Sequence, residues 1–325
     1  MIGGNTDGGN KGGSCAAGSP LAVFAVILQK LRPGLVGILG WAALVNAQPV
    51  PVLPVSAESS PEPSPELSIP PSQGSASAPV PWQRYMDSAG VSVVLKQANT
   101  LIEQEVRNLE KVPLGFTPNQ LQVIRDQLRQ RLGEASLKRD IIARLERDFS
   151  SQQRQELERI LASTSLQQLL DLQQQLDQAR VRQAVRSYRV KLQERSPSER
   201  RLELLSTLDQ ELQQSALETD LKVELRKQLL ATVSHLKTSE TFSEELLESQ
   251  LSAYRDMVEG ETSDNALLAY LYLLKRTPSS SVRDLLVTLD QPAFEAFMAL
   301  CREALQESFR EAREQIPEMA RLAGN

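Results

Sequence analysis

The residues best suited to bind a charged partner form a cationic stripe near the middle of the chain. The stripe, residues 180–201, holds Arg180, Arg182, Arg186, Arg189, Lys191, Arg195, Arg200 and Arg201, with only Glu194 and Glu199 as acids. On a helix, Arg182, Arg186 and Arg189 share one face because they lie three and four positions apart. We therefore consider Arg182, Arg186, Arg189 and Arg195 as candidate contacts for lipid headgroups, envelope polymers or an acidic protein. In the alternative interpretation, the stripe pairs with acidic faces of neighbouring helices.

Groups for metal or nucleophilic chemistry are scarce. His235 is the single histidine of the chain, so a His-rich metal site cannot form, and no cysteine lies at ligand spacing from it. Cys301 shares a helical face with Phe297, Met298 and Leu305, which favours a buried structural thiol over an accessible nucleophile. The sequence thus predicts no cofactor and no metal site.

Paired carboxylates for glycoside cleavage are the remaining enzymatic possibility. A run of acids near the C-terminus, Glu303, Glu307, Glu311 and Glu314, is interleaved with Arg302, Arg310 and Arg313. Such spacing is typical of a solvated helix face. A catalytic acid would need an apolar pocket to raise its pKa, and the sequence indicates none. We expect a protein that is not an enzyme, with an envelope hydrolase as the third alternative.

The charge and residue composition of the chain limit the kind of partner it can bind and the secondary structure it can form. The net charge is −5, and removing residues 1–47, which hold three basic residues and one acidic residue, leaves 33 basic and 40 acidic residues. A general affinity for nucleic acid is excluded, since phosphate neutralisation needs a concentrated excess of Lys and Arg. Aromatic residues make up only 4% of the chain, and Leu, Gln, Glu and Arg dominate its body. This composition favours helices over strands.

The N-terminal part of the chain predicts export. Residues 30–32 (KLR) precede the apolar run 35–45 (LVGILGWAALV), and Val45 and Ala47 place small or aliphatic residues at positions −3 and −1 of a cut before Gln48. This order is typical of a secretory signal peptide cleaved before Gln48, so we assign residues 1–47 to a signal with an extra N-terminal segment. The mature protein would be periplasmic or secreted. In the alternative, an uncleaved N-terminal segment anchors the protein in a membrane.

Residues 48–81 predict a disordered linker. Ten of the 18 prolines fall in this segment, interleaved with Ser, Ala and Glu. Proline fixes φ and removes backbone donors, so the segment favours an extended, solvated chain that acts as a spacer.

The remaining residues predict an all-α fold, an irregular bundle of mostly antiparallel helices. Capping boxes are expected at Thr117, Ser150, Ser165 and Ser196, and another helix start near Ser243. The segment 266–305 is the most apolar part of this body, so we expect it to be the centre on which the other helices pack. The expected helices are 83–111, 118–132, 135–148, 151–163, 166–194, 197–214, 217–237, 243–258, 263–275, 278–289 and 292–315. A seam at 195–198 divides the body into two similar halves, 82–195 and 196–325, with a regular helical solenoid as the alternative architecture.

Two segments of the chain resemble a known protein family in the order of their motifs. Residues 149–172 (FSSQQRQELERILASTSLQQLLDL) and, more closely, 266–305 resemble the short-helix segments of exported bacterial proteins that carry domain of unknown function 2059. In that pattern an aromatic or apolar residue precedes a capped helix, and an apolar helix then ends at a small residue and proline. The resemblance implies an exported, all-helical protein and supplies no catalytic residues.

These observations together favour an exported, non-enzymatic interaction or scaffolding protein of the bacterial cell envelope, whose partner is an unknown protein or envelope component. The alternative is a membrane-surface protein that binds anionic groups through the stripe at 180–201, without spanning the membrane after processing.

Overall fold

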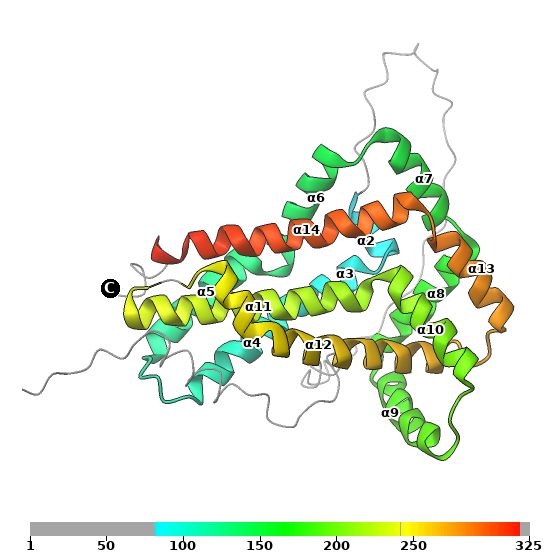
Figure 1. Ribbon diagram of the computed structural model, residues 1–325, viewed down its shortest axis with the longest axis horizontal. Coiled ribbons are helices and arrows are strands. Elements are labelled where there is room, and N and C mark those ends of the chain that lie inside the picture. The colour runs from blue at the N-terminus through cyan, green and yellow to red at the C-terminus, as the bar shows by residue number, and fades with distance from the viewer. Residues whose placement is uncertain (1–81, 241, 319–325) are drawn as a thin grey trace, which may run out of the picture.

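The computed structural model describes residues 82–240 and 242–318, and these form helices joined by short connections (Figure 1). No strand occurs among the described residues. The all-α bundle predicted from composition and capping signals is thereby confirmed. The predicted signal peptide, 1–47, and the predicted linker, 48–81, lie outside the described residues.

The first helices are shorter than the sequence indicates. The expected helix 83–111 is three helices, α2 (Trp82–Ser88), α3 (Val91–Leu95) and α4 (Gln97–Glu110). Gly90 interrupts it, with a φ of 76° that glycine adopts without steric cost. A Cβ at Gly90 would also lie 2.1 Å from Nε2 of Gln214. The break therefore lets the backbone approach the start of α11 (Gln214–Thr238), which a continuous helix would not permit.

The next helices agree closely with expectation up to residue 174. They are α5 (Pro118–Leu132), α6 (Glu134–Asp148), α7 (Ser151–Leu161) and α8 (Thr164–Gln174). The expected helix 166–194 is then wrong, because the short 3-10 turn η1 (Gln175–Asp177) and an extended Gln178 separate α8 from α9 (Ala179–Glu194). This break turns α9 onto α12 (Glu244–Leu273), where Val185 packs against Leu268 and Leu176.

The second half contains two long helices. The elements are α10 (Glu199–Leu212), α11 (Gln214–Thr238), α12 (Glu244–Leu273), α13 (Ser279–Leu289) and α14 (Pro292–Glu314). The expected helices 243–258 and 263–275 are one continuous helix, α12. Gly260 does not end it, since glycine inside a helix costs only about 1 kcal/mol relative to alanine. Gly260 is exposed, so packing places no demand on its missing side chain.

The predicted helix starts are confirmed where the side chain of the capping residue makes a hydrogen bond to the first turn. Thr117 and Ser150 form capping boxes with Gln120 and Gln153, and Ser243 accepts a hydrogen bond from the amide of Leu246. The expected boxes at Ser165 and Ser196 are wrong. The capping positions there are Ser163 and Ser198, and neither side chain makes a capping bond.

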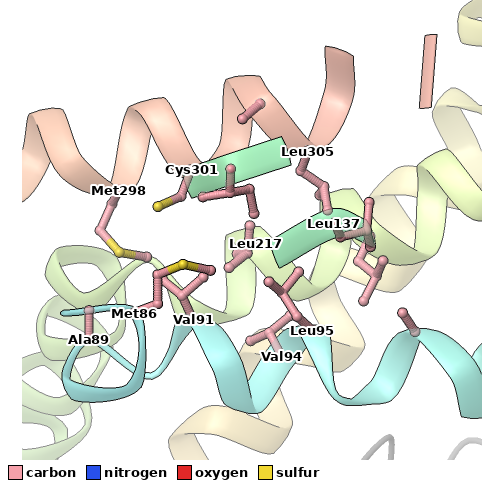
Figure 2. Packing of buried hydrophobic residues seen from close by; sticks show 14 of the residues in the cluster. Met86, Ala89, Val91, Val94, Leu95, Leu137, Leu217, Met298, Cys301 and Leu305 are labelled. Atoms are coloured by element: carbon pink, nitrogen blue, oxygen red, sulfur yellow. The ribbon is translucent and has the colours of Figure 1, made fainter. Parts of the chain in front are cut away.

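Helix α11 is the centre of the bundle, not the segment 266–305. Nearly every residue from Ser215 to Ser234 is buried, whereas Leu267 and Tyr272 of α12 are only half-buried. The apolar face predicted for α14 is confirmed, with Phe294, Phe297, Met298, Cys301, Leu305 and Phe309 buried. Figure 2 shows Met298, Cys301 and Leu305 of α14 facing Met86 of α2 and side chains of α3, with Leu217 of α11 and Leu137 of α6 closing the space.

One main core serves both predicted halves of the body. Its buried residues come from α2 to α8 and from α10 to α14, and the C-terminal helix α14 packs on α6, α7 and α11. The seam at 195–198 is the connection between α9 and α10. Residues on either side of that seam therefore bury their apolar side chains in one shared interior.

Candidate anion-binding surface

Helix α9 carries most of the cationic stripe. Its sequence is rich in Arg, Gln and Ala, which have high helix propensity. The helix ends before Arg195, which is extended at φ −140° and ψ 93°, and Pro197 follows two residues later. Because the residue before a proline is disfavoured in helical geometry, Ser196 and Pro197 prevent the helix from continuing. The stripe therefore divides between α9, the connection 195–198 and the first turn of α10.

A small cluster, here called the satellite core, holds α9 on α12. Its buried residues are Leu176, Val185 and Leu268, and partly buried Val181, Tyr188, Leu192, Ala269, Tyr272 and Leu273 pack around them. The rings of Tyr188 and Tyr272 meet edge to face with centroids 5.7 Å apart. In Figure 1, α9 lies at the lower right, on the side of α12 away from α14. The satellite core is thus small and peripheral compared with the main core.

The structure divides the four predicted site residues into two pairs. Arg182 is 9% exposed, and Arg189 is half-buried with Nη2 donating to Oδ1 of Asn265 on α12 at 3.2 Å. Arg186 and Arg195 are exposed. Arg182 and Arg189 therefore contribute to docking of α9, and only Arg186 and Arg195 of the four are open to a partner.

Arg201 of α10 also turns inward. Its Nη2 donates to the carbonyl oxygens of Leu274 at 2.8 Å and Thr277 at 3.2 Å, and its Nη1 donates to Oγ of Ser279 at 3.1 Å. The guanidinium group thus adds charged hydrogen bonds to carbonyl groups just beyond the end of α12, where the Leu274 carbonyl also accepts from the Thr277 amide. Some cations of the stripe therefore hold neighbouring helices together through carbonyl, amide and hydroxyl oxygens, and pairing of the stripe with acidic helix faces stays a prediction.

The cations that remain accessible define the candidate surface. These outer cations are Arg180, Arg186, Lys191, Arg195 and Arg200, all exposed. Among the described residues, none of the five forms an ion pair. Exposed guanidinium groups without a carboxylate partner attract anions with little desolvation cost.

A larger group of charges surrounds α11, and no sequence pattern predicted it. Asp220, which is 1% exposed, accepts from Nη1 of Arg255 at 3.0 Å and from Nε of Arg302 at 2.8 Å. Glu224 accepts from Nζ of Lys227 at 2.9 Å and from Nη1 of Arg313 at 2.8 Å. The α11 network is the name we give to these six residues together with Glu244 and Glu248.

The α11 network joins three helices. Glu244 of α12 accepts from Nε of Arg313 at 3.0 Å and from Nζ of Lys227 at 3.2 Å, and Lys227 also contacts Glu248. The hydrogen bond from Lys227 lowers the pKa of Glu248. Arg302 and Arg313 were expected on a solvated face of α14, and that prediction is wrong because both reach acids of α11. The network explains how α11 keeps charged residues inside the bundle.

A second polar group, also unexpected, surrounds the junction of α10 and α11. Ser215 donates to Oδ2 of Asp209 at 2.6 Å, while Oδ1 of Asp209 is buried with no hydrogen-bond partner among the described residues. Burial, together with the nearby charge of Glu218, raises the pKa of Asp209 to about 6. Ser215 and Glu218 also line a cavity of about 20 Å³ with Gln173, Thr262 and Tyr270. That space is enough for about one water molecule.

Cys301 on α14 and His235 on α11, the candidates for nucleophilic and metal chemistry, lie on different helices from most of the cationic stripe. Cys301 is fully buried, and burial raises the pKa of its thiol, which opposes formation of a nucleophilic thiolate. His235 is half-buried in the last turn of α11. Within 82–240 and 242–318, no group of three or more His, Cys, Asp or Glu residues is placed to hold a metal ion. The same residues include no helix that is long and apolar enough to cross a bilayer.

Comparison with protein-family models, with curated proteins and with solved structures finds no match for this chain. The resemblance of 149–172 and 266–305 to proteins with domain of unknown function 2059 stays a prediction. The functional proposal therefore rests on the geometry and charge of the outer cations themselves.

Proposed function

We propose that this protein is an exported, non-enzymatic interaction or scaffolding protein of the bacterial cell envelope, and that the outer cations of the stripe bind an anionic partner. The observation that carries the proposal is the contrast within the stripe. Inward-facing Arg182, Arg189 and Arg201 serve the bundle, and the outer cations have no carboxylate partner among the described residues.

The character of the surface supports recognition over catalysis. The outer cations follow a convex helix and its C-terminal connection, so they can contact a phosphate- or carboxylate-bearing surface without enclosing a substrate. Binding of this kind depends on summed charge and falls as salt rises. Export is supported by the order of basic, apolar and small residues in 30–47, and sequencing the N-terminus of the protein from native envelope would test it. A mature N-terminus at Gln48 is expected, and an intact leader on a cytosolic protein would contradict the proposal.

Charge reversal tests the binding surface. In the variant Arg180→Glu, Arg186→Glu, Arg195→Glu, three outer cations change sign. The matched control reverses three exposed arginines on other helices, Arg107 of α4, Arg283 of α13 and Arg310 of α14. Both variants change the net charge by the same amount, so a difference between them reports on position.

The readout is binding at low and physiological salt to two probes, poly-glutamate and phosphatidylglycerol vesicles. We expect the wild-type protein and the control to bind at least one probe with an affinity that falls as salt rises. The α9 variant should lose roughly tenfold or more, because three phosphate or carboxylate contacts are replaced by repulsion. Equal loss in both variants, or no binding of the wild-type protein to either probe at low salt, would contradict the proposal.

Membrane-surface association is the second candidate function. A specific observation favours it, because the inner face of α9 is apolar and lies on the small satellite core, with the partly buried Tyr188 and Leu192 also packed against the main core.

A further inference from the structure

We propose that α9 is a releasable amphipathic helix, which leaves α12 and lies in the headgroup region of an anionic lipid surface. Its apolar inner face would then contact the acyl chains, and its cations would bind lipid phosphate groups. This inference rests on the proposed function, since it identifies the anionic partner of the same helix. Three features of α9 support it, namely its connections, its attachment to α12 and the chemistry of its two faces.

Non-helical residues bound α9 at both ends. On its N-terminal side, η1 is followed by Gln178 at φ −75° and ψ 129°, and on its C-terminal side Arg195 lies at φ −140° and ψ 93°. Ser198, just before α10, is also extended. Rotation at these few positions would reorient α9 without breaking hydrogen bonds inside α9 or α10. Hinges of this kind at element ends accompany rigid movement of the element between them.

The attachment of α9 is small enough to open locally. Among its own residues, only Arg182 and Val185 are buried, and the rest of the satellite core on α9 is half-buried. Val190 of α9 is 57% exposed. Segments with few buried apolar contacts open at a smaller free-energy cost than the whole protein. The partly buried Tyr188 and Leu192 also touch the main core, but none of its buried residues belongs to α9, so that core would remain packed after α9 has left.

The two faces of α9 fit a lipid surface better than a rigid acidic protein. Val181, Val185, Tyr188 and Leu192 recur every three or four residues and make one apolar stripe, while Arg180, Arg186 and Lys191 are exposed. Arg182 and Arg189 border the apolar stripe, and their long side chains could extend to headgroups once α9 has turned. A rigid acidic protein would contact only the outer cations. A lipid surface would engage both faces, because its acyl chains would cover the apolar stripe in place of α12.

The first experiment locks α9 in place. Val185→Cys and Leu268→Cys introduce thiols into the satellite core from the two helices, and Cys15→Ser removes the native thiol outside the described residues. Cys301 is buried and is left unchanged. Each single-cysteine variant controls for the substitution alone. We expect the oxidised double variant to bind phosphatidylglycerol vesicles at least tenfold more weakly than its reduced form, and reduction to restore binding.

A second measurement does not depend on forming the disulfide. In the variant Leu268→Cys, Cys15→Ser, α9 covers the introduced thiol, so its alkylation by a water-soluble maleimide should be slow. Phosphatidylglycerol vesicles should accelerate the alkylation at least tenfold, and neutral phosphatidylcholine vesicles should leave it unchanged. Cys301 serves as an internal reference, because its alkylation should stay slow under both conditions.

The outcomes separate this inference from the proposed function. If the oxidised form binds vesicles as tightly as the reduced form, or bound protein shows no faster alkylation, release of α9 is wrong while anion binding by the outer cations stands. If poly-glutamate is bound and vesicles are not, the partner is an acidic polypeptide and the lipid inference is overturned. If the wild-type protein binds neither probe, both proposals fail.

Discussion

Helices α9 and α11 are both rich in charged residues and lie one helix apart, yet they use charge in opposite ways. On α11, Asp220, Glu224 and Lys227 are almost completely buried and each has an ionic partner on α11, α12 or α14. On α9, Arg186 and Lys191 are exposed and form no ion pair with any residue in the described ranges. The difference does not come from the charges themselves. It comes from α11 being surrounded by helices that supply complementary groups, whereas α9 has a neighbour on one side only.

A charged helix thus has two separate uses that its own residues do not distinguish. A buried charge must be paired, because an unpaired one carries a large desolvation penalty, so the partners of α11 fix how α12 and α14 pack. An exposed charge carries little such penalty and is free for a partner outside the molecule. We therefore assign structure to the α11 network and recognition to the outer cations. The following predictions test that assignment.

The largest expected effect is loss of an acid from the α11 network. Glu224→Ala should lower the free energy of unfolding by about 3–5 kcal/mol, because Lys227 and Arg313 would be left buried with fewer acceptors. The control Glu259→Ala removes an exposed acid from α12 and should have little effect. Urea unfolding followed by circular dichroism measures both. Equal stability of the two variants would show that buried and exposed charges are equivalent here.

Truncating one buried side chain in each core should distinguish the contribution of the main core to stability from that of the satellite core. Leu221→Ala removes a fully buried side chain from α11 and should lower the global free energy of unfolding by roughly 2–5 kcal/mol. Leu268→Ala should instead reduce amide protection of α9 in hydrogen exchange, with a smaller change in global stability, because α9 can open alone. If Leu268→Ala lowers protection across α11 as well, α9 and the bundle unfold as one unit.

The pH dependence of stability should report on Asp209. Burial raises its pKa from 3.8 to about 6, so the folded protein binds this proton more tightly than the unfolded chain does. The contribution of Asp209 to stability is therefore greatest below about pH 4, falls as pH rises to about 6, and then stays low. The difference corresponds to roughly 3 kcal/mol at most.

Asparagine at this position removes the charge and can still accept the hydrogen bond of Ser215. Asp209→Asn should thus be more stable than the wild-type protein at pH 8, by up to about 3 kcal/mol, and the two should converge at pH 4. The exposed Asp256→Asn on α12 is the control and should show no such divergence. Urea titrations from pH 4 to 8 give the comparison. A destabilised Asp209→Asn at pH 8 would mean that the carboxylate is stabilised by its surroundings.

The sequence predicted the fold class and many helix limits, because these depend on local signals. The Thr117 and Ser150 capping boxes and Pro292 at a first helical position mark starts that no tertiary contact is needed to see. The break at Gly90 was missed because its cause is distant. It depends on how closely the backbone approaches Gln214, which lies more than a hundred residues later.

The α11 network and the outer cations could not be predicted from the sequence, since both depend on which helices are neighbours in space. The sequence predicted a helix at 217–237 but not which helices surround it. Only the arrangement of α12 and α14 shows that Asp220 and Glu224 are buried. Likewise, the spacing of the cationic stripe predicted one helical face for Arg182, Arg186 and Arg189. It could not show that α12 covers part of that face, which leaves Arg186 open and buries Arg182.

The smallest effect concerns two adjacent arginines of the cationic stripe. Arg201 donates to the carbonyl oxygens of Leu274 and Thr277, whereas Arg200 is exposed. Arg201→Ala should cost about 1–2 kcal/mol, since it leaves the end of α12 without these charged hydrogen bonds, and Arg200→Ala should change stability very little. Arg201→Lys should recover only part of the loss, because an ammonium group cannot reproduce the fork that contacts both Leu274 and Ser279. For vesicle binding at low salt the order should reverse, with Arg200→Ala weakening binding more than Arg201→Ala does. Two neighbours of equal charge would then differ in opposite directions in the two assays, a result that a general effect of net charge cannot produce.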